Sequence, residues 1–132
     1  MVDKKAPPER LLTDVELELM TILWRVGEGT VSDVQAALPR ERPLAYTSVS
    51  TVLRILEKKG FLATRKQGRG HVYIPLVSKE DYEARSLHDL ISRVFDGTPA
   101  ALVRCLVESS KLSARDLAAL RALLDERAGP AR

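Results

Sequence analysis

Apolar side chains recur with a helical period in three segments of the N-terminal half of the chain. The first segment opens with Thr13 and Glu16, which have the spacing of a capping box. Its apolar stripe, which Gly27 closes, consists of Val15, Leu19, Ile22, Leu23 and Val26. The second segment, Thr30 to Leu38, predicts a short helix that is stopped by Pro39.

The third segment, Ala45 to Lys59, predicts a helix whose two faces differ in chemistry. Its apolar stripe lies at positions i, i+3, i+4 and i+7 and consists of Val49, Val52, Leu53 and Leu56. A turn of about 100° per residue places hydroxyls and cations on the opposite face, namely Thr47, Thr51, Arg54 and Lys58. Hydroxyls reach bases or phosphates at close range and cations neutralise phosphate, so this face is suited to nucleic acid. Gly60 then ends the helix.

A β-hairpin is predicted directly after this helix. Two strand-like runs, Phe61 to Lys66 and His71 to Leu76, flank the sequence Gln67-Gly68-Arg69-Gly70. The glycines of this sequence predict a tight turn with Arg69 at its tip. A recognition helix followed by a basic hairpin is the plan of a winged helix-turn-helix DNA-binding domain.

The candidate DNA-binding side chains fall into three groups. Base contacts concentrate near the start of a recognition helix, and we assign them to Thr47, Ser48 and Thr51. Phosphate contacts are assigned to the cations Arg54, Lys58, Arg65, Lys66 and Arg69. The helix and hairpin contribute three further candidates, Tyr46, Ser50 and His71.

The C-terminal part of the chain predicts three more amphipathic helices. One runs from Ser78 to Asp96, another opens at Thr98-Pro99, and the last opens at Ser113 and ends before Gly129. Helices this short, in about 55 residues, cannot easily bury their apolar stripes alone. We therefore expect a second copy as partner, with an interface formed by Leu87, Leu90, Ile91, Val94, Leu102, Val103, Leu106, Val107, Leu117, Leu120 and Leu124. The alternative is that these helices fold back on the N-terminal part.

The predicted fold class is mostly α with a small β-hairpin. A winged helix-turn-helix domain at residues 11–77 is followed by a helical dimerisation domain at residues 78–132. Residues 1–10 are charged and contain proline, which predicts a flexible N-terminal tail.

Positive charge is concentrated on the predicted helix and hairpin. The whole chain carries a net charge of +3. Residues 40–71 contain eight cations and two acids, a net charge of +6, whereas residues 77–132 contain nine of each. The alternative is that this run of charges is only the solvated face of a helix, as charge runs usually are. Here the charge coincides with the hydroxyl face and the glycine-containing hairpin, and this combination favours DNA binding.

Membrane, metal and catalytic functions find little support in the sequence. No stretch approaches the ~18 apolar residues of a membrane span, and residues 1–10 contain no apolar signal region. We therefore expect a cytoplasmic protein without membrane insertion. The single cysteine, Cys105, excludes an intramolecular disulfide, and its apolar neighbourhood predicts a packed thiol. His71 and His88 lack ligand spacing and catalytic partners, so we predict no metal, no cofactor and no enzymatic activity.

A set of motifs between residues 11 and 127 carries a family resemblance. The motifs are Leu12-Thr13-Asp14-Val15-Glu16, Leu23-Trp24, Ala45-Tyr46-Thr47-Ser48-Val49, Thr51-Val52-Leu53, Leu56-Glu57-Lys58-Lys59-Gly60-Phe61-Leu62, Gly68-Arg69-Gly70-His71-Val72-Tyr73-Ile74-Pro75-Leu76, Leu102-Val103, Leu106-Val107-Glu108 and Leu112-Ser113. In this combination they resemble the penicillinase repressor family, which includes methicillin-resistance repressors and copper-responsive repressors.

The resemblance implies a dimeric transcriptional repressor. Family members bind a palindromic operator with a TACA-type core through the winged helix, and their C-terminal helices form the dimer. Some members are removed from DNA when a membrane-bound, β-lactam-sensing metalloprotease triggers cleavage of an Asn-Phe bond. That bond aligns with Cys105-Leu106 of this chain, a departure from the family's pattern. The copper branch carries a C-terminal cysteine cluster, which this chain lacks.

These observations together predict a repressor of a β-lactamase-like or stress-response gene, of the kind that controls antibiotic resistance. Its expected partners are double-stranded operator DNA, a second copy of the chain and, for the release of repression, a membrane-bound sensor metalloprotease. The alternative is a winged-helix regulator whose DNA binding is controlled by a small-molecule ligand. A winged helix used for protein contact is a third interpretation, which the basic hairpin disfavours.

Overall fold

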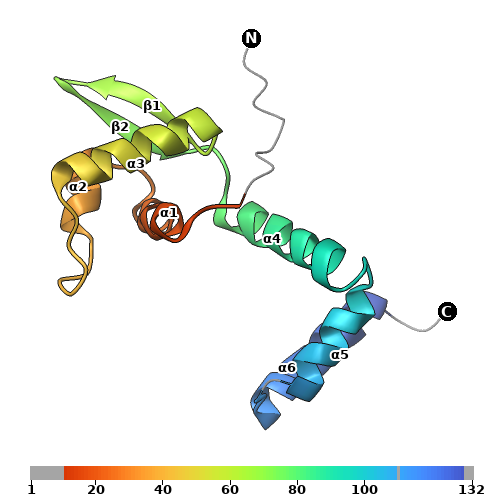
Figure 1. Cartoon of the computed structure of the whole chain (residues 1–132). Coiled ribbons are helices and arrows are strands. Elements are labelled where there is room, and N and C mark those ends of the chain that lie inside the picture. Colours follow the sequence, from red (N-terminus) through yellow and green to blue (C-terminus); the bar gives the residue numbers. More distant parts are fainter. Residues whose placement is uncertain (1–10, 110, 130–132) are drawn as a thin grey trace. The chain divides into compact units, whose positions relative to one another are not determined.

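The computed structural model describes residues 11–109 and 111–129 of the chain. Its elements in chain order are α1 (Asp14–Val26), α2 (Val31–Ala36), α3 (Tyr46–Lys59), β1 (Leu62–Gln67), β2 (Gly70–Pro75), α4 (Lys79–Val94), α5 (Pro99–Ser109) and α6 (Ala114–Ala128) (Figure 1). This order confirms the predicted fold class, mostly α with one antiparallel hairpin. The predicted tail, residues 1–10, lies outside the described residues.

Local capping residues set the ends of the first three helices, and those at the start of α1 and the end of α3 were predicted. At the start of α1 the Thr13 hydroxyl accepts from the Glu16 amide at 3.3 Å, and a Glu16 carboxylate oxygen accepts from the Thr13 amide at 2.9 Å. Thr30 and Asp33 form the same reciprocal pair at α2. Gly60 ends α3 with a φ of 93°, a left-handed conformation that glycine adopts without steric cost.

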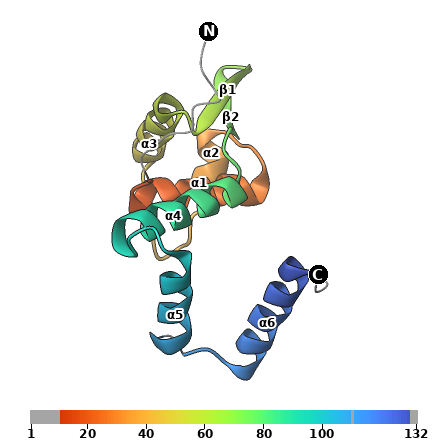
Figure 2. The ribbon, with the colours of Figure 1, turned by 90° about the vertical axis from the view of Figure 1, so that its right-hand side faces the viewer.

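The hydrophobic core of the N-terminal unit forms where the apolar stripes of α1, α2 and α3 meet the hairpin. Figures 1 and 2 show α1 beneath α3 and the two strands, with α2 next to α3. Its largest fully buried side chains are Phe61, Leu19, Met20, Leu23, Leu53, Leu56, Leu62, Val34 and Val49. Burial of one such aliphatic or aromatic side chain stabilises the fold by about 1.5–3 kcal/mol. The prediction for Val26 was wrong: it is 50% exposed, because it is the last residue of α1 and the chain turns away at Gly27.

The hairpin has one more hydrogen-bonded neighbour than the sequence predicted. β1 and β2 pair from Leu62 opposite Pro75 to Gln67 opposite Gly70, which shifts both strands by one residue from the predicted runs. Gly68, at φ 60°, occupies the first turn position, as a type II′ hairpin requires. Next to β2, the loop between α1 and α2 contributes one residue, Gly29, which forms an isolated antiparallel bridge with Tyr73.

The first turn of α4 is packed on the N-terminal unit. The Tyr82 hydroxyl oxygen accepts from the Leu12 amide at 2.9 Å, and the Tyr82 ring centroid lies 5.8 Å from that of Trp24 and 6.1 Å from that of Phe61. Trp24 in turn donates its indole N–H to the carbonyl oxygen of Val77 at 2.8 Å. The compact N-terminal unit therefore extends to residue 86, past residue 77 where the sequence places the domain boundary.

The second compact unit, from residue 87 onward, contains the end of α4 together with α5 and α6. Ser113 and Asp116 form a capping box at the start of α6. α4 ends at Val94, slightly earlier than predicted, because Asp96 adopts a positive φ of 52° in the turn before α5. None of the α5 and α6 side chains that the structure describes is buried.

Across the described residues, every helix is too short or too polar to cross a membrane.

Candidate nucleic-acid interface

The recognition helix α3 presents a polar face to solvent. Its apolar stripe is confirmed, since Val49, Leu53 and Leu56 are fully buried and Val52 packs against the core. Most of the candidate DNA-binding side chains on this helix are exposed, namely Tyr46, Thr47, Ser48, Thr51, Arg54 and Lys58, whereas Ser50 is half-buried. α3 therefore brings hydroxyl groups and cations together on a solvent-accessible face.

The N-terminus of α3 is not capped by a side chain. The cap position is Ala45, and the described residues supply no side-chain cap hydrogen bond there. Thr47, Ser48, Thr51 and Val52 line a shallow surface depression over these first turns. Free amide groups and the helix dipole make such a terminus electropositive, which suits it to an approaching phosphate.

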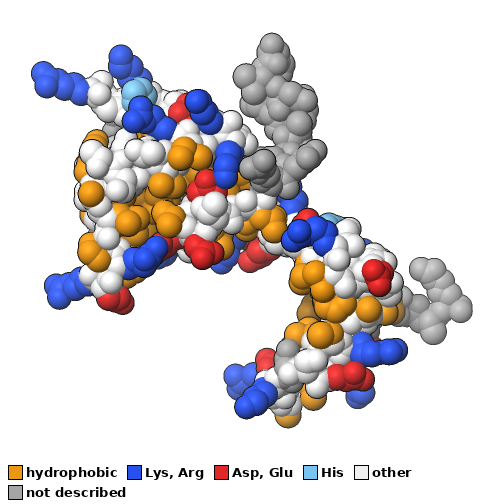
Figure 3. All heavy atoms as spheres, in the orientation of Figure 1, with side chains coloured by type: hydrophobic (Ala, Val, Ile, Leu, Met, Phe, Trp, Pro, Cys, Tyr) orange, Lys and Arg blue, Asp and Glu red, His pale blue; other side chains and the backbone are white. Residues whose placement is uncertain are grey.

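The hairpin carries cations that point into solvent. Lys66, Arg69 and His71 are exposed, and within the described residues none of them takes part in an ion pair or side-chain hydrogen bond. Figure 3 shows Lys and Arg side chains and a histidine gathered around the hairpin. Thr64 of β1 donates its hydroxyl to Glu57 of α3 at 3.1 Å, which links the hairpin to the recognition helix.

Two of the eight cations in residues 40–71 form ion pairs with acidic side chains that lie outside this segment. Arg42 Nε lies 2.9 Å from a carboxylate oxygen of Glu18, and Arg65 Nη2 lies 2.8 Å from one of Glu28. The hydrogen bond from Arg65 holds the pKa of Glu28 below its ordinary value and, reciprocally, raises the pKa of Arg65. Arg65, a predicted phosphate contact, is therefore already bound to a carboxylate.

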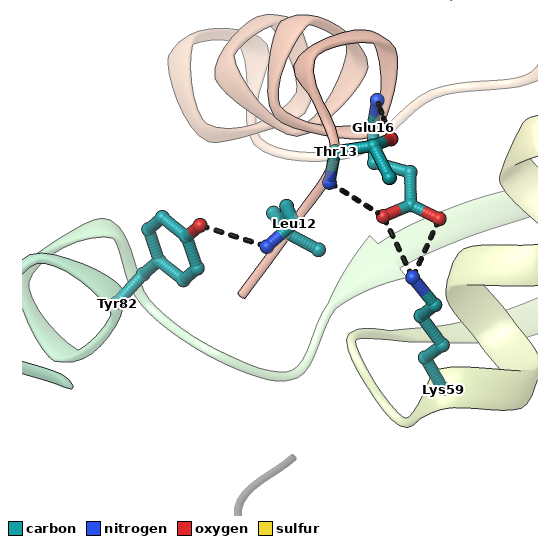
Figure 4. Close-up of polar contacts among 5 residues, drawn as sticks. All are labelled: Leu12, Thr13, Glu16, Lys59 and Tyr82. Carbon is teal, nitrogen blue, oxygen red and sulfur yellow. Dashed lines mark hydrogen bonds and ion pairs between the residues drawn. The ribbon is translucent and has the colours of Figure 1, made fainter. Parts of the chain in front are cut away.

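A third cation, Lys59, forms a partly buried ion pair that joins α3 to α1. Lys59 Nζ donates to both carboxylate oxygens of Glu16 at 2.8 Å, and Glu16 is only 6% exposed (Figure 4). Burial alone would raise the pKa of Glu16, but the hydrogen bonds from Lys59 and Thr13 outweigh it and lower the pKa. Because Glu16, Glu18 and Glu28 all lie outside residues 40–71, the local charge of +6 overstates the positive charge that is free for DNA.

Comparison with known proteins identifies the family. The family model described as penicillinase repressor matches residues 12–126. The chain belongs to the penicillinase repressor family. Among its relatives, the penicillinase repressor of Bacillus licheniformis is 30% identical over 93% of this chain and 94% of its own length. The transcriptional regulator BlaI of Mycobacterium tuberculosis (strain ATCC 25618 / H37Rv) is 35% identical over 87% of this chain and 83% of its own.

A solved structure of a penicillinase repressor relative also matches. It is the solution structure of the monomeric form of Bacillus licheniformis BlaI in complex with the blaP half-operator. The two proteins are 32% identical, the match covers 55% of this chain and 89% of that one, and the TM-score is 0.47.

In this member of the penicillinase repressor family, the predicted dimer-interface residues lie in the C-terminal unit. Most of them are exposed, namely Leu87, Leu90, Val94, Val103, Val107, Leu117 and Leu124, whereas Ile91, Leu102, Leu106 and Leu120 are half-buried. Cys105 is also exposed, and its Sγ lies 3.6 Å from the Ser109 hydroxyl. The expectation of a packed thiol was therefore wrong for the single chain, because no side chain of α5 is buried.

Sequence reasoning missed three residues that shape this repressor-family site. Glu16 was assigned only a capping role, although it also binds Lys59 across 43 residues of chain. Glu28 and Gly29 were assigned no contact, although Glu28 binds Arg65 and Gly29 pairs with β2. The only available signal was the pattern Gly27-Glu28-Gly29, a turn with a single acid, and it does not indicate a partner.

Proposed function

We propose that the protein is a homodimeric transcriptional repressor that binds palindromic operator DNA through α3 and the hairpin. The observation that carries this proposal is the exposed face of α3, where Thr47, Ser48 and Thr51 precede the cations Arg54 and Lys58. An α-helix fits the major groove, where short hydroxyls reach base edges while cations contact flanking phosphates. Operator binding would place the protein in the cytoplasm, with the chromosome.

The open apolar stripes of the C-terminal unit support the dimer. Val94, Val103, Leu117 and Leu124 are between 43% and 65% exposed. Apolar side chains exposed in such number on a small helical unit mark an association surface. A two-fold dimer would present two copies of α3, which matches the two half-sites of a palindromic operator.

The proposed reading face is tested by a Thr47→Val substitution. An operator is first selected from a pool of random DNA duplexes by binding to the wild-type protein. Thr47→Val removes a hydroxyl and keeps the size of the side chain. We expect the preference for the selected duplex over random duplexes to fall by about 1–3 kcal/mol, the cost of one lost base contact. Titration of both duplexes at one salt concentration measures this preference.

A matched control is Thr21→Val, on the exposed part of α1, where the hydroxyl donates to the Leu17 carbonyl. This variant should keep the wild-type preference. If Thr47→Val keeps it as well, Thr47 does not read bases. If the wild-type protein enriches no sequence from the pool and binds no duplex, the proposed function is wrong.

For the release of repression, we propose proteolysis within α5 by a membrane-bound, β-lactam-sensing metalloprotease. The Cys105–Leu106 bond, aligned with the family's cleavage site, lies in a helix whose described side chains are all exposed or half-buried. Intact-mass analysis of the protein from β-lactam-treated cells should reveal a fragment that ends near residue 105. Derepression with only full-length protein present would contradict cleavage and favour a ligand or protein partner as the signal.

A further inference from the structure

The loop between α1 and α2 holds Glu28 in a defined place beside the hairpin. Gly27 takes a φ of 98°, and Gly29 donates its amide to the Tyr73 carbonyl at 3.1 Å. The Tyr73 amide donates back to the Gly29 carbonyl at 2.8 Å. Two backbone hydrogen bonds thus fix the residue next to Glu28 to β2, and the Glu28 carboxylate is positioned by the sheet rather than by a free loop.

Arg65 of β1 meets this carboxylate with two nitrogen atoms. Its Nη2 lies 2.8 Å from Glu28 Oε2, and its Nη1 lies 3.4 Å from Oε1. Arg65 Nη2 also donates to the Gln67 side-chain carbonyl at 3.3 Å. A guanidinium that faces one carboxylate through both terminal nitrogens is held in a set orientation.

The two other cations of the hairpin differ from Arg65 because they have no carboxylate partner among the described residues. Lys66 and Arg69 are exposed, and no ion pair of either occurs among the described residues. Each can neutralise a phosphate without first giving up a carboxylate partner. Arg65, which is 48% exposed beside a 46% exposed Glu28, would have to give up this ion pair, so a phosphate contact by Arg65 gains less than one by Lys66 or Arg69.

We infer that Glu28 limits the affinity of the hairpin for the DNA backbone, because its ion pair with Arg65 keeps the Arg65 guanidinium from contacting phosphate. Lys66 and Arg69 are then the phosphate contacts of the hairpin. This inference rests on the proposed DNA binding and changes the assignment of Arg65 from phosphate contact to positioning residue. Glu28 thereby keeps sequence-independent binding weaker than the cation content of the hairpin allows.

The experiment measures the affinity of the full chain for a random-sequence DNA duplex over a series of salt concentrations. The slope of log affinity against log salt counts the phosphates neutralised, at about 0.9 per phosphate. Glu28→Ala should steepen this slope by about one unit, because it releases Arg65. Arg65→Ala in the Glu28→Ala background should reverse that gain, whereas Arg65→Ala alone should change the slope far less than Arg69→Ala does.

Glu83→Ala is the matched control, since it removes an exposed carboxylate from α4 that has no ion pair among the described residues. The double variant separates release of Arg65 from simple loss of a negative charge, because both Glu28 variants lack that charge. The inference is overturned if Glu28→Ala behaves like Glu83→Ala, if the double variant keeps the gain, or if Arg65→Ala alone lowers the slope by about one unit. Failure of the wild-type protein to bind any duplex would instead overturn the proposed function.

Discussion

The two compact units of the chain bury their apolar side chains to very different extents. In the N-terminal unit, nine large apolar side chains are fully buried, among them Leu53 and Phe61. In the C-terminal unit, α5 and α6 contain no buried residue among those described, and the predicted interface residues Leu117 and Leu124 are 45% and 65% exposed. Figure 3 shows hydrophobic side chains at the surface of this second unit.

This difference in burial does not come from weaker helix-start signals in the C-terminal unit. α1 opens with a Thr13–Glu16 capping box and α6 with an equivalent Ser113–Asp116 box. Local signals of this kind determine where a helix begins, whereas most of its stability comes from packing of its apolar face against a partner. The first unit supplies that partner from its own chain, through the hairpin and α2. In the described part of the second unit, no side chain of α5 or α6 is buried, so its apolar stripes predict association with another copy.

The largest expected effect comes from a charge placed in the predicted interface. Leu106→Asp introduces a carboxylate that would be desolvated in the dimer without a partner, at a cost of several kcal/mol. We expect the dimer dissociation constant to rise by roughly a thousandfold, which corresponds to about 4 kcal/mol. Operator affinity should fall by about a hundredfold or more, because two linked half-site contacts become independent. Sedimentation velocity and operator titration measure the two effects.

Leu123→Asp is the control for this prediction, because Leu123 is 61% exposed and lies outside the predicted interface. That variant should remain dimeric and bind the operator as the wild type does. A dimeric Leu106→Asp protein, or a monomeric Leu123→Asp protein, would show that the interface is placed on the wrong face of these helices.

A smaller effect is expected from truncation of buried and exposed apolar side chains. Leu53→Ala empties part of the N-terminal core and should lower the free energy of unfolding by about 3 kcal/mol at every protein concentration. Trp24, the single tryptophan of the chain, lies in that unit, so its fluorescence follows the unfolding in urea. Leu53 is fully buried, which makes the effect independent of dimerisation.

Val107→Ala is the counterpart in the C-terminal unit, where Val107 is 44% exposed in the single chain. Its cost should be small at low protein concentration and should grow with concentration, because the proposed dimer would bury Val107. Helical circular dichroism during urea denaturation measures this cost. A cost that is large and independent of concentration would mean that the C-terminal helices bury their stripes within one chain.

Much of the fold followed from local sequence signals. Thr13 and Glu16 marked the start of α1, Gly60 marked the end of α3, and Gly68 marked the hairpin turn, as the structure confirms. These signals act within a few residues of chain, through capping bonds and backbone conformations that one residue type favours. The buried face of α3 was predictable for a related reason, since a helical period links Val49 to Leu56 without reference to the rest of the fold.

Contacts between distant residues could not be predicted in the same way. Glu28 and Arg65 are 37 residues apart, and Tyr82 reaches Leu12 across 70 residues. Every acid of the first unit is a potential partner for every cation, and only the packed fold selects among them. For this reason the sequence alone did not indicate that Arg65 pairs with Glu28 or that Tyr82 contacts Leu12.

The smallest expected effect concerns the ion pairs of the two units. Lys59 and Glu16 join α3 to α1 with side chains that are 26% and 7% exposed, whereas the Arg93–Asp89 pair within α4 is 71% and 36% exposed. Glu16→Gln should lower the free energy of unfolding by about 2 kcal/mol at neutral pH, because a hydrogen-bonded, partly buried charge pair is lost. Asp89→Asn should have almost no effect, as is usual for exposed pairs.

The pH dependence of unfolding separates the charge of Glu16 from its packing. The folded-state pKa of Glu16 is lowered from an ordinary value of 4.5, so its contribution is complete above pH 4.5 and is lost as the pH falls through the lower folded-state pKa. The difference in stability between wild type and Glu16→Gln should therefore shrink in that acidic range, while the difference between wild type and Asp89→Asn stays close to zero. Urea denaturation followed by Trp24 fluorescence at a series of pH values measures both differences. A Glu16→Gln deficit that persists unchanged into acid would show that Glu16 stabilises the N-terminal unit by packing and capping rather than by its charge.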